Sequence, residues 1–139
     1  MLYSFNAMLH VTCAIIIKNN KVLICQRSEK MRLPLKWEFP GGKVEPAESL
    51  EACIVREIKE ELHIDIQVLE AYTPVIRHYP DITLTLYPFI CAFVSGDLQP
   101  AEHARALWVT IDDLLQYDWA DADVPIVKEL LVKFRLIDN

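Results

Sequence analysis

An apolar side chain recurs at every fourth position in the segment ESLEACIVREIKEEL, and this spacing strongly constrains the fold. Leu50, Ile54, Ile58 and Leu62 follow one another at intervals of four, which places them along one side of an α-helix and predicts a buried stripe. Pro46 is tolerated in a first helical turn, so we expect the helix to start near that residue. The other side of the helix must then carry the charged residues.

Much of the remaining chain has the composition of β-strands. Two asparagines separate the first two apolar runs and predict a hairpin turn, and the sequence HYPD predicts a second turn. Pro74 and Pro88 lie inside later runs and suggest sheet edges or bulges, because proline cannot donate to a strand ladder. The expected strands cover residues 9–18, 21–27, 36–39, 66–77, 82–94 and 106–109.

Two further helices are expected after the last strand. Thr110 followed by Asp113 suggests a capped helix start, and apolar residues at helical spacing predict an amphipathic helix to the end of the chain. The 139 residues are a usual size for one domain, and the 53% hydrophobic content supplies a sizeable core. We therefore expect a single domain over residues 1–139, with an α+β fold of three helices around a strand-rich sheet.

Charge and cysteine content argue against several classes of protein. A net charge of −6 and a pI near 5.1 argue against a nucleic acid polymer as partner, although a local cationic pocket could still bind a small phosphate compound. The four cysteines lie in apolar runs without a CxxC pair, which predicts buried free thiols rather than disulfides or a zinc site. Without a leader or a membrane-length apolar run, we expect a cytoplasmic protein with no membrane partner.

Three glutamates are crowded on the charged side of the expected helix. Glu57 lies three residues before Glu60 and four before Glu61, so all three share a face. Like charges at these spacings each cost a helix about 0.2–0.5 kcal/mol, and the negative end of the helix dipole adds to the repulsion. One interpretation is a solvated acidic face relieved by Arg56 and Lys59. The other is a site for Mg²⁺ or Mn²⁺, which prefer oxygen ligands.

The complete spacing favours the cation site. Gly42, Glu48 and the segment REIKEELHI follow one another at the separations of the Nudix hydrolase signature, which this chain resembles at every element except one. The family carries glycine where this chain has His63, a position just past the helix end where left-handed residues are common and histidine is tolerated. The segments KWEFPGGK and WADADVPIVKEL resemble the MutT branch of the family, so the resemblance covers nearly the whole chain.

The resemblance implies an α/β/α sandwich with a mixed sheet and the metal-dependent hydrolysis of a nucleoside diphosphate linked to another group. It places Mg²⁺ or Mn²⁺ on the carboxylates of Glu57, Glu60 and Glu61 and on the carbonyl of Gly41. Glu57 is our first choice for the base that takes a proton from water, and Glu60 is the second. Glu102, from the loop before the last strand, is a further candidate ligand.

Three basic residues match functional positions of the family. Arg56 would orient a carboxylate, and we expect it to form an ion pair with Glu48 across the junction of loop and helix. A purely structural pair is the alternative. Arg27 and Lys43 match positions that face substrate in the MutT branch, whereas a solvated surface role is the alternative, and a stronger one for Lys43.

Aromatic and acidic residues supply candidates for base recognition. Trp37 and Phe39 flank Glu38 in a short strand, so alternation places the two rings on one face and the carboxylate on the other. We expect one ring to be a stacking wall and the other to belong to the core, with Trp119 as a further stacking candidate. Asp123 falls where the MutT branch recognises the base, and its alternative role is to cap the last helix.

The resemblance therefore implies a MutT-like nucleoside triphosphate pyrophosphohydrolase that releases a nucleoside monophosphate and pyrophosphate. The leading substrate is an oxidised guanine nucleotide such as 8-oxo-dGTP, with cytosine nucleotides and ADP-ribose-like compounds as alternatives. A binding module without turnover is a third possibility, but such a module is expected to lose the arginine or the metal carboxylates, which are all present here. The expected partner is a small nucleotide, and the oligomeric state is left open.

Overall fold

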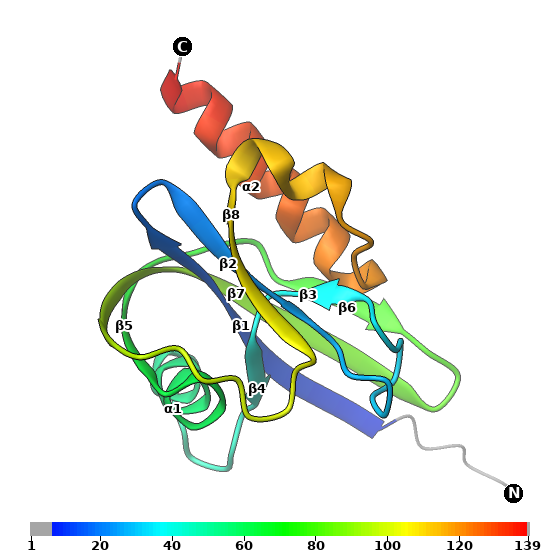
Figure 1. Ribbon diagram of the computed structural model, residues 1–139. Helices are drawn as coiled ribbons and strands as arrows, with labels where there is room; N and C mark the ends of the chain where they lie inside the picture. The colour runs from blue at the N-terminus through cyan, green and yellow to red at the C-terminus, as the bar shows by residue number, and fades with distance from the viewer. Residues whose placement is uncertain (1–6, 139) are drawn as a thin grey trace, which may run out of the picture.

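The computed structural model describes residues 7–138, which form a mixed eight-stranded sheet with helices on both faces (Figure 1). The α-helices are α1 (Leu50–Leu62) and α2 (Val124–Asp138), and the short 3₁₀ helices are η1 (Ile111–Gln116) and η2 (Asp121–Asp123). The strands are β1 (Ala7–Lys18), β2 (Lys21–Gln26), β3 (Trp37–Glu38), β4 (Gly41–Lys43), β5 (Ile64–Ala71), β6 (Val75–His78), β7 (Ile82–Gly96) and β8 (Arg105–Thr110). The expected α+β sandwich is confirmed.

Strand β1 pairs with three other strands and positions the glycine pair. It runs parallel to β7 and antiparallel to two different strands, β2 at its carboxyl end and β4 nearer its start. The register of the β1–β4 pair sets Cys13 opposite Gly41 and Thr12 opposite Gly42. The glycine pair is therefore fixed between β1 and helix α1, at the point where β1 parts from β2.

Two hydrophobic cores form because successive side chains of β1 point to opposite faces of the sheet. One face packs against α1 and the other against α2, on opposite sides of the sheet in Figure 1. The stripe predicted for the central helix is buried as expected, together with Cys53. All four cysteines are buried free thiols, as the sequence predicted. No helix in the range 7–138 is both long and apolar enough to cross a bilayer.

Helix α1 begins at Leu50, and the expectation of a start near Pro46 is wrong. The side-chain oxygen of Ser49 caps the helix by accepting a hydrogen bond from the amide of Ala52 at 3.1 Å. Pro46 lies instead in a turn that precedes the helix, where its fixed φ is equally suitable. The turn continues through Ala47, whose φ of 63° is incompatible with a right-handed helix.

The carboxyl end of α1 confirms the interpretation of His63. This residue has a φ of 62° and lies in the left-handed region, and its backbone N–H donates to the carbonyl of Lys59 at 3.1 Å. Histidine thus occupies the position that ends the helix and turns the chain into β5. The exception to the family signature changes the cap residue and leaves the cap geometry in place.

Other sequence expectations need correction. The strand expected over 66–77 is divided into β5 and β6, and Pro74 lies in the break. Pro88, although in the interior strand β7, lies between the residues that pair with β5 and those that pair with β6. Strand β4 was not anticipated, because two glycines have low strand propensity. Thr110 makes no side-chain cap bond, and the segment that follows is a 3₁₀ helix.

Candidate active site

A pocket of about 370 Å³ opens beside the glycine pair. Its walls come from β1, from the β3–β4 segment, from the loop between β2 and β3, and from the turn that leads into α2. Four of the residues proposed from the sequence to face substrate line it: Arg27, Phe39, Lys43 and Asp123. Residues scattered over nearly a hundred positions therefore meet at one cavity.

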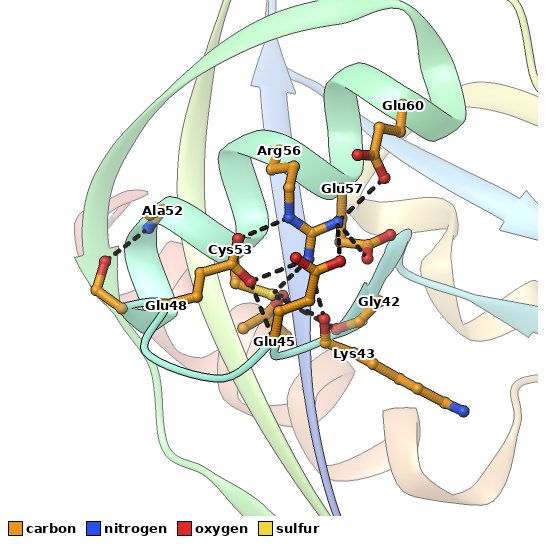
Figure 2. A network of polar contacts seen from close by, with 11 residues as sticks. Gly42, Lys43, Glu45, Glu48, Ala52, Cys53, Arg56, Glu57 and Glu60 are labelled. Atoms are coloured by element: carbon orange, nitrogen blue, oxygen red, sulfur yellow. Dashed lines mark hydrogen bonds and ion pairs between the residues drawn. The ribbon is translucent and has the colours of Figure 1, made fainter.

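Arg56 is the centre of a polar network on the exposed side of α1 (Figure 2). Its Nε donates to Glu48 Oε2 at 2.6 Å and its Nη2 donates to Glu48 Oε1 at 2.9 Å, so the pair is bidentate. These hydrogen bonds lower the pKa of Glu48 from its usual 4.5 to about 2 and raise the pKa of the guanidinium. The ion pair expected from the sequence is present, and it anchors the loop before α1 to the helix.

The same guanidinium holds two of the crowded carboxylates. Arg56 Nη1 donates to Glu57 Oε1 at 2.9 Å and to Glu60 Oε2 at 3.0 Å (Figure 2). Its Nη2 also donates to the carbonyl of Lys43 at 3.1 Å. One arginine therefore relieves the repulsion between neighbouring glutamates and fixes them relative to the turn that follows the glycine pair.

Both glycines lie in close contact with their neighbours. A Cβ on Gly41 would lie 1.8 Å from the carbonyl oxygen of Thr12 on the neighbouring strand. A Cβ on Gly42 would lie 2.2 Å from the carboxyl carbon of Glu57. The absence of side chains at these two positions allows β4 to pair with β1 on one side and to touch the glutamate on the other.

Glu61 differs from its neighbours because Arg56 does not reach it. Its Oε2 atom is buried without a hydrogen-bond partner among the described residues. Burial raises the pKa of this carboxyl, and the negative charge of Glu102 raises it further. The amide of Ala101 donates to the carbonyl of Glu61 at 2.9 Å, which fastens the loop carrying Glu102 to the end of α1.

The candidate ligands suit an oxygen-coordinating cation by their chemistry. Glu61 Oε2 is a buried acceptor that lacks a partner, and a cation is a physical means of satisfying it. Within residues 7–138, however, no three acidic, histidine or cysteine side chains already converge as a metal cage. The carboxylates of Glu57 and Glu60 pair with Arg56 instead.

On the pocket wall, two donors share the carboxylate of Glu38. Arg27 Nη1 donates to Glu38 Oε1 at 2.6 Å, and His103 Nε2 lies 2.8 Å from Glu38 Oε2. Burial would raise the pKa of Glu38, but the hydrogen bond from His103 and the charge of Arg27 outweigh it, so the pKa is lowered. Sequence reasoning missed Glu38 and His103. The available signal was a charged residue between two aromatic residues in a short strand.

Trp37 and Phe39 lie on one face of the sheet, as the alternation predicted. Trp37 and Phe39 belong to the same buried cluster, on the side of the sheet that α2 covers. Phe39 also lines the pocket, whereas Trp37 packs edge-on against Tyr117 with ring centroids 5.0 Å apart. Trp119 lies behind Phe39 at 4.9 Å and donates from its indole nitrogen to the carbonyl of Leu114. Phe39 is thus the available wall, and Trp119 supports it.

Asp123 connects the end of the chain to the pocket. It is 5% exposed, and its Oδ1 accepts a hydrogen bond from the amide of Phe39 at 2.9 Å. The observed bond therefore ties the turn before α2 to the β3–β4 segment, which is a contact that neither base recognition nor the alternative helix cap predicted. Burial, together with the charge of Glu38, raises the pKa of Asp123 well above its usual value.

Lys43 is exposed in β4, and its side chain extends away from the carboxylates (Figure 2). It also lines the pocket, so its amine is available to an anion that enters from solvent. This placement is compatible with both interpretations of Lys43, a substrate contact and a solvated surface lysine.

A sheet enclosed by helices, with a glycine pair beside an arginine-held acidic helix, defines the class of Nudix-domain proteins, and comparison with known proteins agrees. A family model described as the NUDIX domain matches residues 8–130. The chain is 36% identical to the CTP pyrophosphohydrolase of Escherichia coli over 124 residues, which cover 89% of this chain and 92% of the relative. It is 29% identical to the 8-oxo-dGTP diphosphatase of Escherichia coli over 113 residues, 81% of this chain and 88% of the relative.

A solved structure shares the fold. The solution structure of the DNA mismatch repair protein MutT from methicillin-resistant Staphylococcus aureus superposes with a TM-score of 0.78 and 36% identity, over 93% of this chain and 99% of that one. The chain therefore belongs to the Nudix hydrolase family, among its MutT-like members.

Proposed function

We propose that this protein is a metal-dependent nucleoside triphosphate pyrophosphohydrolase that acts on oxidised guanine nucleotides such as 8-oxo-dGTP and releases a nucleoside monophosphate and pyrophosphate. The observation that carries the proposal is the unsatisfied carboxylate oxygen of Glu61, on the same helix as the ordered Glu57. The glycine pair of β4, which touches Glu57, also lines the pocket. An acceptor-rich site beside a cavity suits a cation and the phosphate chain of a nucleotide.

In this proposal the cation, Mg²⁺ or Mn²⁺, is held by Glu57, Glu60, Glu61 and the carbonyl of Gly41, with Glu102 as a further ligand. When bound, such a cation polarises a phosphoryl oxygen and lowers the pKa of a water molecule. Glu57 serves as the base that receives the proton from the attacking water, and Glu60 is the second candidate.

The other residues of the chain bind and orient. Arg56, itself paired with Glu48, donates to Glu57 and holds that carboxylate beside the glycine pair of β4. Arg27 and Lys43 supply positive charge along the pocket for the phosphates. For the base, Phe39 offers an aromatic face and Asp123 a carboxyl group on the same wall.

A cytosine nucleotide is the second candidate substrate. The 36% identity to a CTP pyrophosphohydrolase over 89% of the chain favours it. Both bases offer amino hydrogens to a carboxyl group such as Asp123, so that residue does not separate them. Nucleotide substrates of either kind would place the enzyme in the cytoplasm.

The test is an assay of purified protein with 8-oxo-dGTP, dGTP, CTP and ADP-ribose, each with Mg²⁺ or Mn²⁺ and with a chelator. We expect pyrophosphate and the nucleoside monophosphate from 8-oxo-dGTP, and no turnover in the chelator. A higher kcat/KM for CTP would select the cytosine alternative. Nucleotide binding without hydrolysis under all metal conditions would overturn the proposal in favour of a binding module.

A further inference from the structure

His103 has a buried side chain in a segment that is otherwise mostly exposed. The segment 97–104 connects β7 to β8. The amide of Gln99 donates to the carbonyl of Leu62 at the end of α1, and the amide of Ala104 donates to the carbonyl of Gln26 at the end of β2. The imidazole of His103 is 4% exposed. Burying a polar ring carries a cost unless it is hydrogen-bonded, so its partner indicates its role.

That partner is Glu38, and the charge of its carboxyl group determines which of the two side chains donates. Glu38 has a lowered pKa and is therefore ionised at neutral pH, so both its oxygens can only accept hydrogen bonds. His103 must donate from Nε2, at 2.8 Å. The other oxygen of Glu38 accepts from Arg27 at 2.6 Å. The carboxylate is thus held between a loop residue on one side and a pocket residue on the other.

We propose that His103 is a positioning residue of the nucleotide pocket: it holds Glu38 in the orientation that keeps the guanidinium of Arg27 on the pocket wall. This inference rests on the proposed function. Without the imidazole, the freed oxygen of Glu38 would also turn to Arg27, because bidentate pairing with a guanidinium is favourable. Arg27 would then be drawn away from the position in which it meets substrate.

A role in the carboxylate cluster is the competing explanation. His103 Nδ1 is buried without a partner among the described residues, and so is Glu61 Oε2. If His103 served Glu61, its loss would change the metal requirement. If it serves Glu38, its loss would change the affinity for nucleotide. The two roles therefore differ in a measurable way.

The experiment compares His103→Leu, which removes the donor at similar size, with His103→Gln, whose amide can still donate to Glu38. KM and kcat are measured for the best nucleotide, together with the Mg²⁺ concentration for half-maximal rate. For His103→Leu we expect KM to rise about tenfold, the equivalent of one lost hydrogen bond to a charged group, with kcat and the Mg²⁺ requirement unchanged. His103→Gln should restore most of the affinity.

A double variant tests whether the effect passes through Glu38. On a Glu38→Met background, which leaves no oxygen to accept from His103 or Arg27, His103→Leu should add no more than about a twofold change in KM, because two residues that act as a unit are not additive. Gln99→Leu, an exposed change in the same segment, is the matched control for disturbance of the loop. If His103→Leu does not fold, His103→Ala, which also removes the donor, supplies the same comparison.

Three results would overturn the positioning role of His103. An unchanged KM in a folded His103→Leu protein, or a shifted Mg²⁺ requirement with unchanged KM, would overturn the positioning role while leaving the proposed function intact. Equal losses in Gln99→Leu and His103→Leu would also overturn it. A parent protein that neither hydrolyses nor binds nucleotide, as measured by calorimetry, would overturn both the proposed function and this inference.

Discussion

Gly42 lies directly against the carboxylate of Glu57, so closely that a Cβ on the glycine would come within 2.2 Å of the carboxyl carbon. The contact joins β4 to the helix that carries the acidic cluster. Because the atoms in contact lie at the end of a flexible side chain, a Gly42→Ala change can be accommodated by moving Glu57. We expect activity to fall by at least about tenfold, since small displacements of a catalytic group are costly. Stability, from urea unfolding, should fall by less than about 1 kcal/mol.

Gly41→Ala is the matched comparison, and here we expect the main loss to be in stability. A Cβ at this position would lie 1.8 Å from the backbone oxygen of Thr12, which cannot move without parting β1 from β4. Overpacking of this kind typically costs about 1–3 kcal/mol. Equal unfolding midpoints for Gly41→Ala and Gly42→Ala would contradict this prediction, because they would show that the backbone of β4 shifts at no greater cost than the side chain of Glu57.

Glu57→Gln should lower kcat by at least about a hundredfold, the usual scale for a lost acid-base or metal group. The amide oxygen can still accept the hydrogen bond from Arg56, so the protein without metal should change in stability by no more than about 1 kcal/mol. Single-turnover rates and thermal unfolding in a chelator measure the two effects. A large loss of melting temperature would indicate that Glu57 is mainly a structural ion-pair partner.

His63→Gly should retain full activity and gain up to about 1 kcal/mol in unfolding free energy, because glycine adopts the left-handed conformation without strain. Ala47→Gly is the control, since Ala47 has a φ of 63° in a turn outside the helix. Both should be measured by chemical denaturation. A collapse in turnover for His63→Gly alone would make the imidazole a functional group.

Glu48→Gln tests the ion pair with Arg56 through the pH dependence of the unfolding free energy. The pKa of Glu48 is lowered from 4.5 to about 2, so its contribution to stability is present above pH 4.5 and is lost as the pH falls through 2. The difference in unfolding free energy between parent and variant should therefore shrink across this window. A constant difference from pH 4.5 to pH 2 would contradict the pairing as the source of the effect.

Asp123→Asn tests which hydrogen bonds the buried carboxyl group makes with the base. The sequence favoured an ionised side chain that only accepts hydrogen bonds, but the raised pKa favours the neutral form, which donates as well as accepts. The side-chain amide of asparagine can also both donate and accept hydrogen bonds. We expect the base preference of the parent, as kcat/KM for 8-oxo-dGTP, dGTP, CTP and ADP-ribose, to change as the pH rises, whereas that of the variant stays constant.

Stability gives an independent check on the same residue. A raised pKa means that the contribution of Asp123 is present below its usual pKa of 3.8 and is lost as the pH rises through the value in the folded protein. The variant should therefore gain stability relative to the parent as pH increases. Asp123→Leu, which can make no hydrogen bond to Phe39, should lose base preference at every pH. Parallel changes for all four substrates would confine Asp123 to a structural role.

The sequence by itself determined the features that depend on local periodicity and spacing. The stripe from Leu50 to Leu62 fixed one face of α1, and the same helical period placed Glu57 and Glu60 within reach of Arg56. The separation of the signature elements also identified His63 as a left-handed cap. These conclusions hold because an α-helix converts distance along the chain directly into position on a face.

Local signals failed where two structures were equally compatible with the same residues. Pro46 suits both the first turn of a helix and the second position of a tight turn, and the positive φ of Ala47 with the cap at Ser49 places it in the turn. The run 66–77 has strand composition throughout, yet it divides because different parts of it pair with different stretches of β7.

Only the tertiary structure decided which distant residues share a site. His103 and Glu38 are separated by 65 positions, and Asp123 and Phe39 by 84. Each pair meets because strands and loops from separate parts of the chain pack around one pocket. The same packing excludes water and sets the pKa of Asp123 and Glu38 in opposite directions: burial dominates for the first, and two donors outweigh burial for the second. Solvation and long-range contacts have no period in the sequence, so they are fixed by the folded structure alone.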